Sequence, residues 1–367
     1  MEKYIGIMSG TSLDGVDTAL VETDGKQIKL LAYDFFTMPE DLKADVLDVC
    51  IGQQTNLVKI GEIDHRLGHV FADAVNQLIS TSHTSISEIT AIGSHGQTVF
   101  HAPDSRYPFT MQLGDANIIA AKTGITTVAD FRRKDMALGG QGAPLVPAFH
   151  QALFDHLDNN IVILNIGGIA NLSIINGDQT SGYDTGPGNM LMDAWVQKHY
   201  QQSFDKDAQL AKSGTIDQAL LQAMLREPYF QQPAPKSTGR ELFNLPWLEN
   251  ILLSFSTSIP DVQATLAELT AITIAEQVKK FEKNNTTNEL LACGGGAQNP
   301  LLMARLTELL PNWQVGNTLK YGIDADYMEA MAFAWLAHQT MNRQPGNLPA
   351  ATGASRLAVL GAIYPAI

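Results

Sequence analysis

Hydrophobic residues alternate with small or polar residues on both sides of a short turn near the N-terminus. Ile5 and Ile7 precede the turn, and Val16 and Val21 follow it. Alternation with a period of two predicts β-strands, so we expect two strands joined as a hairpin. The pattern returns over residues 161–175, which read IVILNIGGIANLSII. Two such hairpins, each opening one half of the chain, suggest an internal duplication.

Apolar residues spaced three and four positions apart predict helices between and after these hairpins. The expected helices cover residues 40–50, 57–80, 190–200, 260–283, 301–310 and 326–339. A further strand is expected at 29–38, and a proline-rich stretch at 226–247 is expected to be a loop, as a lid or a substrate-side insertion.

The turn of the first hairpin is rich in glycine, hydroxyl and carboxylate groups. Between the two strands lie Ser9, Gly10, Thr11, Ser12, Asp14 and Gly15. Glycines let the backbone turn so that N–H groups and hydroxyls face one anion, with Asp14 or Asp17 near any bound magnesium. An ordinary hairpin has the same pattern. The second turn, with Asn165, Gly167, Gly168 and Asn171, could hold the same polyphosphate from the other side.

Polar side chains also follow other predicted strands. His95 and Gln97 come at a strand end, where α/β folds bind ligands, and could donate to sugar hydroxyls or phosphates. A structural loop histidine is the alternative. Arg132 and Arg133 adjoin the glycine-rich run 139–142, as a guanidinium fork for an anion or as an exposed basic loop.

Three sites in the second half have two interpretations each. Asp184 precedes a Gly-Pro-Gly turn, as a turn former or as a general base. The triple glycine 294–296 permits either close approach of a ligand or close helix–strand packing. Glu329 lies in the first turn of an apolar helix, where it either completes a capping box with Asp326 or points into a cleft.

Composition narrows the class of protein. With 45% hydrophobic and 17% charged residues, the chain resembles an ordinary soluble globular protein. No apolar run approaches the roughly 18 residues of a membrane span, no signal peptide is visible, and Cys50 and Cys293 fit no metal spacing, so we expect a cytoplasmic protein. A net charge of −14 argues against nucleic acid or an anionic membrane as partner. A small anionic ligand remains possible, held by local N–H groups, arginines and a metal ion.

Seven segments together closely resemble the anhydro-N-acetylmuramic acid kinase family. They are GTSLDGVD (10–17), SHGQTVFH (94–101), ADFRRKDMALGGQGAPLVP (129–147), NIGGIANLS (165–173), DTGPGNMLMD (184–193), CGGGAQN (293–299) and EAMAFAWLA (329–337). They follow the family's order over almost the whole chain. The resemblance implies an α/β fold of the actin, sugar kinase and Hsp70 ATPase type, with two domains of mixed sheet around a central nucleotide cleft. The domains would be 1–130 plus 341–367 and 131–340.

The resemblance also implies roles for individual residues. Gly10, Thr11, Ser12, Leu13, Asp14, Gly15, Val16 and Asp17 would form the first phosphate loop. Asn165, Gly167, Gly168 and Asn171 would lie at the second, with Gly294, Gly295 and Gly296 near the adenosine. Asp184 would be the catalytic base, while Glu329 would place the water or the sugar. Arg133 would anchor the substrate, with His95 and Gln97 close by.

The reaction that the resemblance implies is ATP- and Mg²⁺-dependent. Water opens the 1,6-anhydro bridge of 1,6-anhydro-N-acetylmuramic acid, and the released 6-oxygen takes the γ-phosphate, giving N-acetylmuramate 6-phosphate and ADP in peptidoglycan recycling. A homodimer is expected on the same basis. Two rivals stay open at this point: a glycoside hydrolase using Asp184 and Glu329 without ATP, and a non-catalytic actin-like ATP-binding protein.

Overall fold

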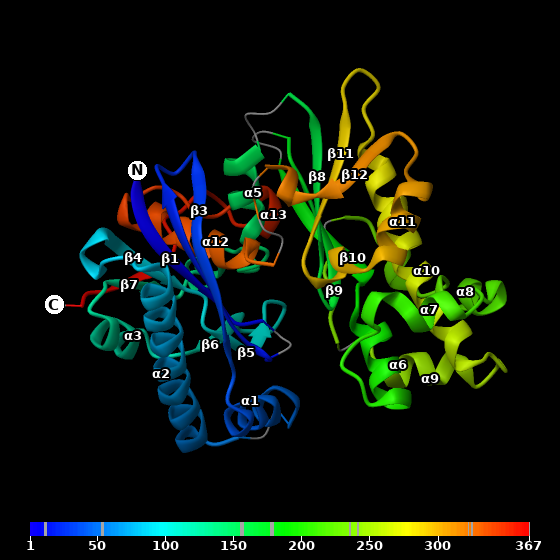
Figure 1. Ribbon diagram of the computed structural model, residues 1–367, viewed down its shortest axis with the longest axis horizontal. Helices are drawn as coiled ribbons and strands as arrows, with labels where there is room; N and C mark the ends of the chain where they lie inside the picture. The colour runs from blue at the N-terminus through cyan, green and yellow to red at the C-terminus, as the bar shows by residue number, and fades with distance from the viewer. Residues whose placement is uncertain are drawn as a thin grey trace. The chain divides into compact units, whose positions relative to one another are not determined.

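The chain forms two compact units, residues Met1–Leu153 with Tyr327–Ile367 and residues Phe154–Asp326 (Figure 1). The computed structural model describes residues 1–10, 13–52, 55–154, 158–176, 180–234, 236–240, 242–321, 323 and 326–366. Among these residues, no helix combines the length and the apolar character that crossing a membrane requires.

The first unit is built on a six-stranded sheet with the strand order β13-β7-β4-β1-β2-β3. Strands β1–β2 and β2–β3 pair antiparallel, whereas β1–β4 and β4–β7 pair parallel. Its elements are β1 (Glu2–Met8), β2 (Gly15–Thr23), β3 (Ile28–Thr37), α1 (Glu40–Gly52), α2 (Leu57–Ser82), β4 (Ile89–Ser94), β5 (Gln97–Ala102), β6 (Phe109–Leu113), α3 (Ala116–Thr123), β7 (Thr127–Ala129), α4 (Arg133–Ala137), α5 (Val146–Phe154), α12 (Met328–Met341), α13 (Pro349–Thr352) and β13 (Ala362–Tyr364).

The second unit repeats this plan in a five-stranded sheet with the order β10-β9-β8-β11-β12. Strands β8–β9 and β9–β10 pair antiparallel, and β8–β11 and β11–β12 pair parallel. Its elements are β8 (Asn160–Ile166), β9 (Ile169–Ile174), β10 (Ser181–Pro187), α6 (Met190–Tyr200), α7 (Gln209–Ser213), α8 (Gln218–Met224), α9 (Leu245–Leu252), α10 (Ile259–Val278), β11 (Asn288–Cys293), α11 (Pro300–Leu309) and β12 (Trp313–Asn317).

Within each unit, the strand after the antiparallel hairpin lies at one edge and two parallel strands follow on the other side of the first strand. The expected α/β fold with two duplicated mixed sheets is therefore confirmed, and β1/β2 and β8/β9 are the two predicted hairpins.

Helix α12 lies directly against the first sheet because two glycines make room for it. Gly6 on β1 and Gly93 on β4 are neighbours in register. A β-carbon at Gly6 would lie 1.7 Å from the Ala330 carbonyl oxygen, and one at Gly93 would lie 2.0 Å from the Phe333 carbonyl oxygen. Because side chains alternate along a strand, Ile5 points the other way, into the core formed with α2.

These contacts account for a difference in the domain boundaries. Residues 327–340 were expected in the second domain, but α12 packs on β1, β2 and β4 of the first unit. Residues 131–153 also belong to the first unit. The capping box expected at the start of α12 is wrong, because the N-cap residue is Tyr327 without a side-chain cap, and Asp326 Oδ2 instead accepts a hydrogen bond from Gln298 Nε2 at 2.7 Å.

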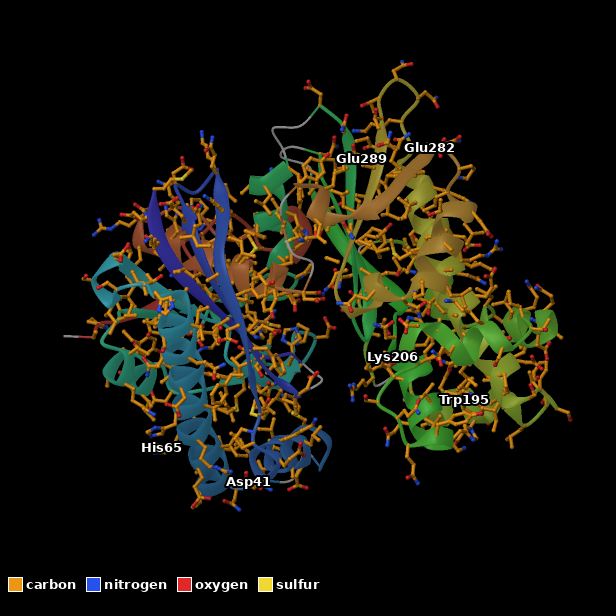
Figure 2. All side chains as sticks on the ribbon, viewed as in Figure 1. Asp41, His65, Trp195, Lys206, Glu282 and Glu289 are labelled. Atoms are coloured by element: carbon orange, nitrogen blue, oxygen red, sulfur yellow. The ribbon has the colours of Figure 1, made fainter. Side chains whose placement is uncertain are left out.

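In the second unit, a buried carboxylate of the sheet is paired. Glu289 on β11, labelled in Figure 2, is 1% exposed and accepts hydrogen bonds from Lys320 Nζ and Tyr321 Oη, both at 2.9 Å. The proline-rich stretch expected as a loop contains a 3₁₀ turn at Pro228–Gln231 and the beginning of helix α9. Tyr229 and Phe243 from this stretch are buried in the unit's core, so part of the stretch belongs to the packed structure.

Candidate active site

The first hairpin turn is tied to the strand end that carries Gln97. Ser9 Oγ donates to Gln97 Oε1 at 2.7 Å, and both side chains are buried. Leu13 adopts a left-handed φ of 56° and is buried in the core, which fixes the far side of the turn. Asp14 is exposed and Asp17 is half-buried. Thr11 and Ser12, two of the expected phosphate-loop residues, lie outside the described residues.

His95 lies beside this turn and holds an inward-pointing arginine. Arg132 donates from Nε and Nη2 to His95 Nε2, at 3.1 and 2.8 Å, and from Nη1 to the Gly142 carbonyl at 2.8 Å. Burial and the adjacent Arg132 guanidinium hold the pKa of His95 well below its usual range. His95 is therefore neutral, and because its Nε2 accepts, its hydrogen is on Nδ1.

Glu329 has its electrostatic partner in the same group. Burial raises the pKa of Glu329, and the Arg132 guanidinium opposes that rise. Burial also lowers the pKa of Arg132, to about 10, which leaves it charged at neutral pH. Phe333, one turn after Glu329 on α12, packs on the His95 ring with centroids 4.7 Å apart. Glu329 and His95 are thus both linked to Arg132 in the first unit, whereas Gln97 bonds to Ser9 of the first turn.

Arg133, the arginine expected to anchor the sugar, lies at the surface and points away from the His95 that Arg132 contacts. Its side chain is 66% exposed and pairs with Asp130 at 2.6 Å. The sequence did not indicate Arg132 as a site residue. Two adjacent arginines are equivalent in sequence, and only the folded backbone directs one inward and the other outward. The His95–Arg132 pair could only have been suggested by their closeness to glycine-rich turns.

In the second unit, the turn of the second hairpin is fastened to the turn after Asp184. Gly188 N donates to Gly168 O at 2.8 Å, and Asn189 N donates to Gly167 O at 2.9 Å. A β-carbon at Gly188 would lie 2.3 Å from Gly167 O, so this approach of two backbones requires glycine. Gly168 itself is exposed.

The triple glycine 294–296 shows both close packing and open backbone, the two features that its interpretations required. Gly294 has a φ of 76°, and a β-carbon there would lie 2.3 Å from Asn165 Oδ1, beside the second hairpin turn. Gly296 packs equally closely on Ile166. Gly295 is exposed, and nothing lies within 4 Å of the position of its β-carbon. Two glycines therefore serve packing, and the middle one presents open backbone.

Asp184 occupies a bulge of β10. Its register partner on β9 is Asn171, and the register shifts between Asp184 and Gly186. Bulges redirect side chains and are common beside active sites. The half-buried carboxylate accepts hydrogen bonds at Oδ2 from Ser237 Oγ and from Thr238 N, both at 3.0 Å. These partners lie far along the chain, so the carboxylate is held by tertiary structure.

Each unit by itself thus gathers part of the predicted site. The first unit joins the first turn to Gln97 and places Glu329 with His95, while Arg133 is separate from them on the surface. The second unit joins the second turn to the Gly294–Gly296 run and to the turn that follows Asp184. Among the described residues, no cluster of three or more His, Cys, Asp or Glu side chains could hold a metal ion.

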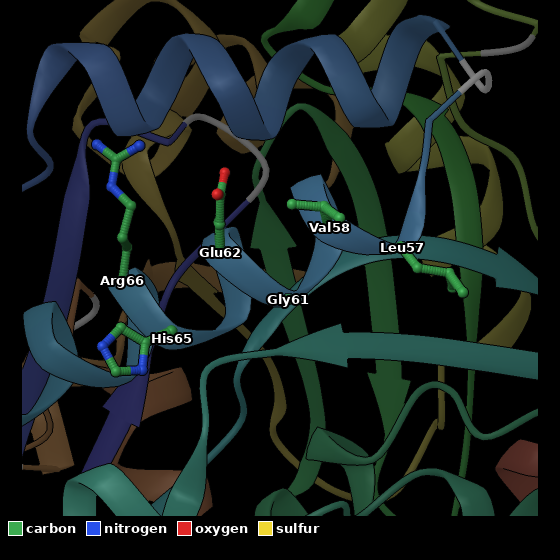
Figure 3. A pocket seen from close by; sticks show the side chains of 6 residues that line it. All are labelled: Leu57, Val58, Gly61, Glu62, His65 and Arg66. Carbon is green, nitrogen blue, oxygen red and sulfur yellow. The ribbon is translucent and has the colours of Figure 1, made fainter.

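A separate surface hollow lies along the first half of α2 and contains none of the predicted site residues. Figure 3 shows its lining side chains on α2, Leu57, Val58, Gly61, Glu62, His65 and Arg66. Leu57 is 91% exposed. The hollow therefore plays no part in the candidate active site.

Two sheets of one strand order, each with a glycine-bearing turn in its first hairpin, define the actin-like class of nucleotide-binding proteins. Within this class the sequence is decisive. The chain belongs to the anhydro-N-acetylmuramic acid kinase family, whose model matches residues 2–366.

Relatives that carry the name anhydro-N-acetylmuramic acid kinase are similar over their full length. The one from Photobacterium profundum is 63% identical over 372 residues, covering 100% of this chain and 99% of the relative. The one from Aliivibrio fischeri is 62% identical and covers 100% of both. The one from Pasteurella multocida is 57% identical and covers 99% of this chain and 96% of the relative.

Proposed function

We propose that this chain is an ATP-dependent kinase that opens 1,6-anhydro-N-acetylmuramic acid with water and phosphorylates its 6-oxygen. Membership of the family supports the activity and the sugar. The observation that carries the mechanism is the Asp184 carboxylate, held at a strand bulge beside the second hairpin turn. No observation favours hydrolysis without ATP or a non-catalytic role.

In the proposed reaction, Asp184 takes a proton from a water molecule whose oxygen bonds to the anomeric carbon. The bond from that carbon to the 6-oxygen breaks, and the 6-oxygen then bonds to the γ-phosphorus of ATP as ADP leaves. Glu329 would help to place the water or the sugar, and Arg133 would anchor the substrate. His95 and Gln97 would lie close to the sugar. Burial raises the pKa of Glu329, which makes its neutral form more accessible than that of an exposed glutamate.

The nucleotide would be held mainly by backbone. The exposed Gly168 and the open position at Gly295 fit a phosphate chain and an adenosine approaching closely, because a side chain at either position would obstruct them. Gly10–Asp17 would contribute N–H groups from the first turn. Mg²⁺, which neutralises phosphate charge, would be carried largely by ATP, with Asp14 or Asp17 as its protein ligand.

The proposal is tested by Asp184→Asn, which keeps the shape of the side chain but removes its basicity. We expect kcat to fall at least about 10²-fold, with ATP binding retained. The matched control is Asp207→Asn, at an exposed position with a left-handed φ of 56° that asparagine tolerates. Near-parent turnover by Asp184→Asn would show that another group is the base.

The products test the reaction itself. In ¹⁸O-labelled water with ATP and the anhydro-sugar, mass spectrometry should find label at the anomeric position and phosphate at the 6-position of one product. Unphosphorylated N-acetylmuramic acid without ADP would instead establish a hydrolase. We also propose a cytoplasmic homodimer working in peptidoglycan recycling, for which the family is the support; sedimentation of the purified protein as a monomer would contradict the dimer.

A further inference from the structure

The segment Lys236–Thr238 makes three hydrogen bonds with Asp184, although the proposed reaction steps do not use it. Ser237 Oγ and Thr238 N donate to the Asp184 carboxylate, both at 3.0 Å. Asp184 N donates to the Lys236 carbonyl at 3.0 Å. The backbone of Asp184 thus bonds to Lys236, and its carboxylate bonds to Ser237 and Thr238, the next two residues of the proline-rich stretch.

The buried side chain of Lys236 anchors this segment. Only 8% of the residue is exposed, and its Nζ donates to the carbonyl oxygens of Tyr229 and Phe230, at 3.0 and 3.3 Å. The ammonium also lies 4.4 Å from the centroid of the Tyr229 ring, within cation–π range. Burying an ammonium is costly unless its donors are satisfied, and these contacts stabilise the Lys236 side chain in its buried position.

Tyr229 and Phe230, whose carbonyl oxygens accept from Lys236, also contact Asp184 and the bulge of β10. Tyr229 Oη donates to the Asp184 carbonyl at 2.8 Å. A β-carbon at Gly186 would lie 2.7 Å from Phe230, so that ring is packed against the bulge of β10. Lys236, the segment that follows it and the bulge of β10 are therefore connected through Tyr229 and Phe230.

We infer that Lys236, Ser237 and Thr238 form a carboxylate clamp, whose task is to position Asp184 and keep it ionised. The inference rests on the proposed role of Asp184 as the base. Two donors at one oxygen stabilise the carboxylate relative to its protonated form and restrict its rotation. Lys236 and Ser237 are positioning residues, which act on the reaction through Asp184.

The direct test is Ser237→Ala, which removes one donor from an exposed residue. We expect kcat to fall about 3–10-fold with KM for ATP within about twofold, because the nucleotide is bound elsewhere. The acid limb of the kcat/KM profile should move about 0.5–1 pH unit higher, since the carboxylate becomes easier to protonate. The control is Ser213→Ala, an exposed serine of the same unit whose hydroxyl donates to the Leu210 carbonyl at 2.7 Å. It should leave the profile unchanged.

Lys236→Met tests the anchor, because methionine keeps much of the stem and removes the charge. We expect a fall in kcat of about 10²-fold, an acid limb displaced in the same direction, and partial recovery in Lys236→Arg. If Lys236→Met does not fold, the Ser237→Ala profile decides alone.

The outcomes separate the clamp from the base. If Asp184→Asn is inactive while Ser237→Ala keeps the parent's kcat and pH profile, the clamp is refuted and the base assignment stands. If Asp184→Asn turns over at the parent rate, the base assignment fails and the clamp fails with it. An inactive Asp184→Asn together with a displaced acid limb in Ser237→Ala supports both.

Discussion

Gly93 offers a direct test of how closely helix α12 packs against the first sheet. In Gly93→Ala, the new β-carbon would lie 2.0 Å from the Phe333 carbonyl oxygen and 3.0 Å from the Ala337 β-carbon. Ordinary carbon–oxygen contacts are about 3.3 Å or longer, so the helix must retreat by roughly 1.3 Å. The obstacle is backbone, which no rotamer change can move aside.

The cost of this retreat follows from the contacts that α12 makes. Overpacking costs about 1–3 kcal/mol, and a gap of about 1 Å forfeits up to half of the dispersion energy of the facing atoms. We therefore expect a loss of about 3 kcal/mol in the free energy of unfolding. For a unit of this size that lowers Tm by about 6–12 °C. Displacing Glu329 by about 1 Å should also reduce kcat by up to about 10²-fold.

Thermal and urea unfolding, followed by far-ultraviolet circular dichroism, would measure the change. The matched control is Gly61→Ala, in the interior of α2 with no atom within 4 Å of its β-carbon (Figure 3). It should gain about 0.5–1 kcal/mol through helix propensity. If Gly93→Ala melted within about 1 °C of the parent protein, the close approach of α12 to β4 would be refuted.

Two further predictions concern charges in the second unit. Burial raises the pKa of Asp193 to about 7, against the attraction of Arg240; the folded state then keeps a proton that the unfolded chain releases near pH 4, so stability falls as pH rises from about 4 to 7. Asp193→Asn should be more stable than the parent by on the order of 2 kcal/mol at pH 8 and equal to it near pH 4, and equal gaps at both pH values in urea titrations would contradict this. Arg305→Met should cost about 2–3 kcal/mol, because it strands Glu268, whose side chain is 6% exposed and accepts from Nε and Nη2 at 2.8 and 2.9 Å. Glu308→Ala, which removes only the exposed partner of the same arginine, should cost less than about 0.5 kcal/mol, and similar losses in both variants would refute the distinction.

Local patterns were sufficient to predict most secondary structure. The alternation around Ile5 and Ile7 predicted the first hairpin, and the repeat over 161–175 predicted the second, because strand periodicity is a property of neighbouring residues. The helix expected at 326–339 is found at Met328–Met341. Its place in the molecule was not predictable in the same way. Contact with the glycines of β1 and β4 depends on residues more than two hundred positions away in the sequence.

The site divides along the same line. Sequence by itself determined the duplicated hairpins, the glycine turns and the family, because these depend on residue order and on motifs that need no partner. Only the tertiary structure decided that Arg132 turns inward while Arg133 pairs with Asp130 at the surface, and that Ser237 and Thr238 grip Asp184. Hydrogen bonds between distant segments arise from how the chain packs, and adjacent identical side chains are distinguished only by the direction in which the folded backbone points them.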